Sequence, residues 1–226
     1  MDTIKFMKMD FMTMRTQTKL IGALAIVVCI LTNKVLNESM GTWGIMYMIF
    51  MGIVLASMPF TVDMTILDGF VRLLPAKASS RVYGRYLFGV IFLILCSVVG
   101  VCLSLPVLIK QQISMGYVLS ITAAYLGAGC FTNSLQYVFS YFFNIKNPQM
   151  LSIIRLIPGF AFFFGGSILA SMLEDVSSGV VGRIGDVLNF LMKYYNVFSW
   201  GILLVSLVFT ILCAYICGKR EEHREM

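Results

Sequence analysis

Six long apolar stretches, separated by short polar segments, run through this chain of 226 residues. Each stretch is long enough to cross the roughly 30 Å hydrocarbon core of a bilayer as a helix. None of them shows the alternation of polar and apolar residues that is typical of membrane barrel strands. The pattern therefore predicts six membrane-spanning helices. The predicted spans are residues 20–36, 43–62, 86–109, 116–143, 153–173 and 196–217.

The composition supports a lipid-covered exterior. Hydrophobic residues make up 59% of the chain and charged residues only 12%, whereas charged residues make up about 25% of an average soluble domain. A soluble protein with so few charges would not cover its surface. We therefore expect an all-α, polytopic membrane protein in which residues 1–226 form a single transmembrane domain.

The basic residues predict the orientation. The N-terminal segment, the second and fourth loops and the tail contain 13 of the 17 Lys and Arg residues, and the opposite segments contain 4. Basic residues are enriched in the cytoplasmic segments of membrane proteins, so both termini are predicted to lie in the cytoplasm. The net charge of +6 is then a topology signal and needs no nucleic-acid partner.

Residues 1–19 precede the first span and are expected to form an amphipathic helix. Ile4, Met7, Phe11 and Met14 recur at helical spacing, with basic residues between them. This pattern is typical of a helix that lies in the cytoplasmic membrane interface, with its apolar side in the acyl chains and its lysines toward anionic lipid headgroups. The alternative is a disordered basic leader.

The longest predicted cytoplasmic loop, residues 63–85, also has a helical pattern. Its apolar positions are Ile66, Leu67, Phe70, Val71 and Leu74. Pro75 ends this pattern because proline disfavours α geometry at the preceding residue, and Ser79 or Ser80 then caps the helix of the third span. We expect a short helix followed by re-entry into the membrane. A solvated connector is the alternative.

The longest predicted outside loop, residues 174–195, carries apolar residues with a period of 3.6 residues and three glycines. The glycines weaken a helix by up to about 1 kcal/mol each. We expect an extracellular re-entrant or interfacial helical hairpin before the last span, rather than a free loop.

Catalytic groups are missing from the predicted spans. The sole histidine, His223, lies in the charged tail, and no span holds a pair of carboxylates. This argues against an intramembrane enzyme, and the chain has no nucleotide-binding G-x-x-x-x-G-K-[ST] motif. All six cysteines fall in apolar runs, so no disulfide framework is expected. Cys213 and Cys217 share a helical face, but no His or carboxylate lies within the same span to complete a metal site. We expect no catalytic and no metal-binding residues.

The fourth span carries a polar face formed by Asn133, Gln136 and Ser140. Buried amides in a membrane either bond neighbouring helices or line a polar path, and we favour bonding between helices. No Lys, Arg, Asp, Glu or His lies in the middle third of any predicted span, which argues against an ion-coupled transporter. If the protein transports a substrate, energy is expected to enter through the cytoplasmic loop. A stand-alone channel or facilitator that uses the Asn133 face is the alternative.

Two sequence stretches carry a resemblance to a known family. One runs Asp-Met-Thr-Ile-Leu-Asp-Gly-Phe-Val-Arg-Leu-Leu-Pro over residues 63–75, followed by Arg-Val-Tyr-Gly-Arg-Tyr-Leu over residues 81–87. The other, Lys-Met-Asp-Phe over residues 8–11, is similar to the family's Lys-Asp-Phe opening, interrupted by Met9. With the six-span pattern, these stretches resemble the small bacterial permease subunits of ABC type 2 transporters.

The resemblance implies a permease of an exporter in the bacterial plasma membrane. It would pair with a second permease, identical or homologous, and with cytoplasmic ATPase subunits that bind the ATP and Mg²⁺; this chain would hold no cofactor. Family substrates are peptides, antibiotics, lipids or other amphipathic molecules. The helix of residues 63–75 would contact the ATPase. The residues that the resemblance assigns to this coupling are Asp63, Leu67, Asp68, Phe70, Arg72, Leu74 and Pro75.

Overall fold

The computed structural model describes most of the chain, and its described residues form helices joined by turns, with no strand among them. The described residues are 2–35, 42–62, 77–142, 157–161, 164–165 and 194–225. Four helices are long and apolar enough to cross a membrane: Trp43–Phe60, Ala78–Lys110, Met115–Phe142 and Tyr195–Arg224. The all-helical membrane architecture is therefore confirmed. Most of the predicted fifth span and nearly all of the outer hairpin fall outside the described residues.

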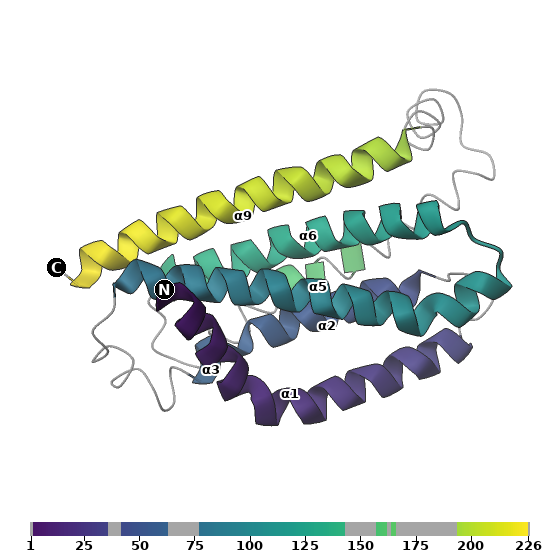
Figure 1. Cartoon of the computed structure of the whole chain (residues 1–226), viewed down its shortest axis with the longest axis horizontal. Helices are drawn as coiled ribbons and strands as arrows, with labels where there is room; N and C mark the ends of the chain where they lie inside the picture. Colours follow the sequence, from purple (N-terminus) through teal and green to yellow (C-terminus); the bar gives the residue numbers. More distant parts are fainter. Residues whose placement is uncertain are drawn as a thin grey trace.

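Helix α1 (Asp2–Val35) joins two elements that the sequence pattern predicts separately, the N-terminal amphipathic helix and the first span. The helix is continuous because the stretch contains no proline and a single glycine, Gly22. Figure 1 shows that it bends sharply, so that its first half crosses the bundle and its second half runs along it. Its apolar part, Gly22–Leu31, is shorter than a full span.

The predicted second span is divided into α2 (Trp43–Ala56) and α3 (Met58–Val62). The break lies at Ser57, whose hydroxyl donates a hydrogen bond to the Val54 carbonyl at 2.7 Å. Pro59 explains the break, because it has no N–H to donate and its ring crowds the carbonyl four residues earlier.

Helices α5 (Ala78–Lys110) and α6 (Met115–Phe142) form an antiparallel pair joined by a short turn. Helix α5 begins eight residues before the predicted start of the third span, so the end of the predicted cytoplasmic loop is helical. The predicted serine cap is wrong: the cap residue is Lys77, without a side-chain hydrogen bond. Ser79 instead donates to the Glu222 carboxylate of the last helix, which fixes the start of α5 against the C-terminal region.

Helix α9 (Tyr195–Glu225) lies along α6 and runs in the same direction (Figure 1). The Ser120 hydroxyl donates to Asn196 at 2.6 Å, and Ser134 bonds Thr210 at 2.8 Å. Between these pairs, a Cβ added at Gly127 would lie 2.8 Å from the Leu203 Cα. The three contacts recur every seven residues on both helices, which is the repeat of parallel helices that supercoil around each other. We call this set of contacts the α6–α9 seam.

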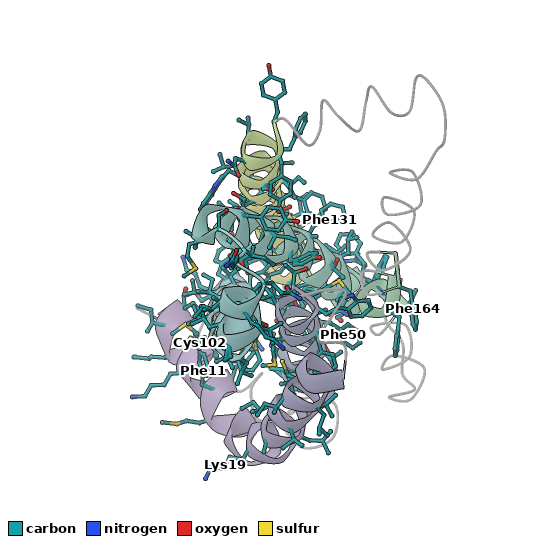
Figure 2. The ribbon with its side chains drawn as sticks, turned by 90° about the vertical axis from the view of Figure 1, so that its right-hand side faces the viewer. Phe11, Lys19, Phe50, Cys102, Phe131 and Phe164 are labelled. Atoms are coloured by element: carbon teal, nitrogen blue, oxygen red, sulfur yellow. The ribbon has the colours of Figure 1, made fainter. Side chains whose placement is uncertain are left out.

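The helices form a stack with α9 and α1 on opposite sides of α5 and α6, as both views show (Figures 1 and 2). The outward side of α9 is strongly apolar. Val197, Val205 and Ile211 are 70%, 71% and 68% exposed, although residues of this type are normally buried in soluble proteins. An exterior of this kind is suited to contact with lipid, so the protein is a multi-pass membrane protein.

Candidate functional site

The seven residues assigned to ATPase coupling, Asp63 to Pro75, lie outside the described residues. Both flanks of this connector are described. Helix α3 ends at Val62 and α5 begins at Ala78. Close to these ends, the Arg85 guanidinium of α5 lies over the Phe60 ring of α3, 4.6 Å from its centroid. The two flanks are therefore in direct contact at one end of the bundle.

Arg85 contacts three helices besides its own. Its Nε atom lies 3.8 Å from the Asp10 Oδ2 of α1, its guanidinium stacks on Phe60 of α3, and it donates a hydrogen bond to Tyr141 of α6. The side chain is only 12% exposed. A cation over an aromatic face contributes up to about 2 kcal/mol when it is desolvated. We call Asp10, Phe60, Arg85 and Tyr141 the Arg85 junction.

Asp10 is the acidic member of the junction, and its side chain is 7% exposed. Burial raises the pKa of Asp10 above its ordinary value of 3.8, and the positive charge of Arg85 lowers it only in part. Removal from water penalises the charged form of a carboxyl group. The ionised carboxylate is therefore held in this position at a net cost.

The first half of α1 is held on α5 by apolar contacts. The Phe11 ring meets Phe88 edge-on at a centroid distance of 4.7 Å, and a Cβ added at Gly84 would lie 2.8 Å from the Thr3 carbonyl and 2.9 Å from the Phe6 Cβ. Gly84 thus lets the two helices approach closely. Phe6 itself is 7% exposed.

Two residues of the predicted apolar side of residues 1–19 make contacts within the bundle. Met7 and Phe11 pack against the core of α2 and α5, where α5 offers an aromatic surface that the sequence pattern does not reveal. Ile4, Lys5, Lys8 and Met12 occupy the exposed side of the helix, and Lys19 points away from the bundle in Figure 2.

The polar face of the fourth span lies inside the bundle. Asn133 and Gln136 are buried at 1% and 0% exposure, and Ser140 donates to the Gln136 carbonyl of its own helix at 2.8 Å. The Asn133 amide hydrogen-bonds the Tyr137 hydroxyl, which in turn donates to the Ala56 carbonyl of α2 at 2.8 Å. The two amides thus occupy contacts between helices of this chain.

Part of the predicted fifth span packs beside these amides. A Cβ added at Gly159 would lie 3.5 Å from the Gln136 Nε2 atom, and the Phe160 ring lies 5.7 Å from the Phe50 ring of α2 and 6.1 Å from the Phe164 ring. Figure 2 shows Phe50 and Phe164 on the same side of the bundle. Helix α6 is therefore covered on this side within the chain itself.

A family model described as "ABC-2 family transporter protein" matches residues 5–219, nearly the whole chain. The chain belongs to the ABC-2 transporter family. This confirms the resemblance seen in the two sequence stretches. No curated protein and no solved structure matches the chain. The ABC-2 membrane domain is the transporter's permease component and carries no catalytic centre.

The Arg85 junction of this ABC-2 transporter subunit was missed by sequence reasoning. Arg85 counted there only as one of the basic residues at the membrane edge, and Asp10 only as part of an N-terminal motif. The available signal was their membership of the two stretches that carry the family resemblance. Their contact links positions 75 residues apart, which no local pattern reveals.

The described part of the subunit contains no group of three side chains suited to a metal ion. None of its six cysteines forms a disulfide with another of them, and Cys102 alone among the six is exposed. The Cys217 thiol lies 3.5 Å from the Tyr86 hydroxyl, so it takes part in packing between α5 and α9.

Proposed function

We propose that this chain is the membrane-spanning permease subunit of an ATP-driven ABC exporter in the bacterial plasma membrane. It pairs with a second permease, identical or homologous, and with separate ATPase subunits that bind ATP and Mg²⁺. The cargo is a peptide, antibiotic or other amphipathic molecule. The observation that carries the proposal is the family match over residues 5–219.

The charge distribution supports an orientation with both termini in the cytoplasm. The exposed lysines Lys5, Lys8, Lys77 and Lys219 belong to the end of the bundle where the N- and C-termini lie (Figure 1). Lys110 lies at the other end of α5. By the positive-inside rule, this distribution supports a cytoplasmic position for the end with both termini. The ends of α3 and α5 that flank residues 63–76 would then lie on the side where ATP is available.

The contact between the connector's flanks supports a coupling role for that segment. A helix bound in a groove of a partner can pass a rigid-body movement to the helices it joins. Here the joined helices are α3 and α5, and their Phe60–Arg85 contact lies near both ends of the connector. A force on the connector therefore reaches α1 and α6 through the same guanidinium.

A new negative charge in the connector tests the proposal. We expect Arg72→Glu or Leu74→Asp to leave the permease folded and to abolish substrate stimulation of ATP hydrolysis, because each change disrupts the surface offered to the ATPase. The matched control is Lys110→Glu at the opposite end of α5, which should leave this stimulation unchanged. The measurement is ATP hydrolysis by the complex co-purified with the ATPase encoded by a neighbouring gene.

Three outcomes would contradict the proposal: no ATPase subunit travels with the chain, deletion of residues 65–75 leaves transport intact, or the two connector variants retain full stimulation. Flux through the purified chain alone, without ATP, would support the facilitator instead. The burial of Asn133 and Gln136 gives that alternative no exposed polar wall within the described residues.

A further inference from the structure

The first half of α1 docks on α5 through contacts of opposite character. The apolar contacts favour docking: Phe11 meets Phe88 edge-on at 4.7 Å, and the backbone near Thr3 and Phe6 approaches Gly84 closely. The Asp10 carboxylate opposes docking, because it leaves water for a site where its side chain is 7% exposed. Docking therefore depends on what offsets the charge of Asp10.

Arg85 offsets this charge only partly. The Nε–Oδ2 distance of 3.8 Å is longer than a hydrogen bond, and one atom pair, rather than two parallel bonds, makes the contact. A buried ion pair recovers its desolvation cost only when its geometry is excellent. The raised pKa of Asp10 agrees with this. The titratable groups coupled to Asp10 from the neighbouring helices are Arg85 of α5 and Tyr137 and Tyr141 of α6.

The guanidinium is shared with α3, which adjoins the connector, and with α6. Arg85 stacks on Phe60, two residues before the end of α3, and bonds Tyr141 near the end of α6. A shift of α3 relative to α5 changes the position of the guanidinium. The same shift changes how well Arg85 compensates the negative charge of the Asp10 carboxylate.

We propose that residues 2–12 of α1 switch between a docked and an undocked position, and that Arg85 is the positioning residue that sets the balance between them. Arg85 compensates the negative charge of the Asp10 carboxylate, and movement of the connector changes this compensation. The part of this inference that concerns ATP rests on the proposed function. The two-position behaviour of α1 does not.

The inference predicts opposite effects for the two partners. Arg85→Gln removes the cation that faces the buried Asp10 carboxylate, so α1 undocks. Asp10→Asn removes the charge that opposes docking and keeps the shape, so α1 docks more firmly. An ion pair that simply fastens the helix predicts release in both variants. The sign of the Asp10→Asn effect therefore separates the two interpretations.

The test uses the full-length chain in lipid nanodiscs with spin labels at Lys8→Cys and Lys219→Cys, two exposed positions on α1 and α9. Cys102→Ser removes the one exposed native thiol. The label-to-label distance distribution reports docked and undocked populations. We expect the docked-to-undocked ratio to fall about fivefold or more in Arg85→Gln and to rise by a similar factor in Asp10→Asn, the lower range of ordinary coupling between sites.

Two controls accompany the variants. Lys19→Gln removes a charge from the exposed side of the same helix and should leave the ratio unchanged. Labels at Ile109→Cys and Val197→Cys, both about 70% exposed on the core helices, should keep their separation in every variant if the bundle remains folded. Undocking in both Arg85→Gln and Asp10→Asn, or no change in either, would overturn the inference.

A second arm adds the co-purified ATPase with ATP and vanadate. We expect the nucleotide to shift the docked-to-undocked ratio in the wild-type chain and to have little effect in Asp10→Asn. If the first arm gives opposite signs and the nucleotide shifts nothing, the link to the connector is refuted. If no ATPase assembles, the proposed function fails, while the first arm still decides whether α1 switches.

Discussion

Where α6 meets α9, neutral polar side chains pair at hydrogen-bond distance, Ser120 with Asn196 and Ser134 with Thr210. Where α1 meets α5, the paired side chains are charged, and the Asp10–Arg85 pair is separated by 3.8 Å. Both regions have a glycine that brings two backbones together, Gly127 in the seam and Gly84 where α1 meets α5. The junction adds an aromatic ring and a tyrosine from two further helices.

The difference separates a fixed contact from an adjustable one. Neutral hydrogen bonds between membrane helices have little desolvation cost to recover, and close packing at small residues holds the helices together. In a buried charge pair with imperfect geometry, the cost of removing the charges from water is similar in size to the attraction between them. A small displacement therefore changes the free energy of the pair. We therefore expect α6 and α9 to move as one unit and the first half of α1 to move separately.

The largest expected effect comes from Gly127→Ala at the seam. An added methyl group would collide with backbone atoms of Leu203 at 2.8 and 2.9 Å, which have no flexible end to yield. Overpacking of this kind costs about 1–3 kcal/mol, and thermal unfolding in detergent should show a Tm lower by several degrees. Gly201→Ala is the control: its added methyl group meets nothing within 4 Å. If Gly127→Ala left the Tm unchanged, the seam would not be tightly packed.

Arg85→Gln should have a smaller and more local effect. We expect a loss of about 1–2 kcal/mol from the cation–aromatic contact, with the change concentrated in α1 because undocking returns Asp10 to water. Hydrogen exchange should accelerate in residues 2–12 and remain slow in α6 and α9. Uniform acceleration through all helices would contradict the distinction between junction and seam.

Ser134→Ala should lower the free energy of unfolding by less than either of these two changes. Hydrogen bonds between membrane helices average about 0.6 kcal/mol, and Thr210 keeps its bond to the Ser206 carbonyl. A double-mutant cycle with Thr210→Val measures the coupling between the two hydroxyls. A coupling well above 2 kcal/mol would mean that the seam depends on this bond more than on Gly127.

The smallest expected effect is a pH dependence of α1 docking. Since burial raises the pKa of Asp10 in the docked position, the proton is bound more tightly there than in water. The resulting stabilisation of the docked position is present below the ordinary value of 3.8 and is lost as the pH rises through the raised value. The docked fraction should fall over this window in the wild type and stay constant in Asp10→Asn. A docked fraction that rises with pH would contradict the predicted direction of this pH dependence.

Much of the fold follows from the sequence because lipid imposes a simple rule on length and hydrophobicity. The apolar runs predict α6 to within one residue at each end. The predicted third span starts eight residues after the start of α5, and the predicted last span ends eight residues before the end of α9. The difference arises because a helix continues past the bilayer into charged sequence. The break at Ser57 was missed although Pro59 signals it.

The candidate site is less predictable for a physical reason. Hydrophobic periodicity shows that Met7 and Phe11 share a face but not whether lipid or α5 covers it. Asp10 and Arg85 each look like ordinary interfacial charges, and only their contact makes them unusual. Asn133 and Gln136 share a predicted face, yet their burial beside Gly89 of α5 and Gly159 depends on how the helices pack.

The most direct test of the central claim, that energy reaches this permease through the connector between α3 and α5, is site-specific photocrosslinking from Phe70 in the assembled transporter. We predict a covalent adduct with the ATP-hydrolysing subunit, and none from the same crosslinker at Ile109, which is 71% exposed at the opposite end of α5. An ATPase that co-purifies but forms adducts only from positions outside the connector would contradict it.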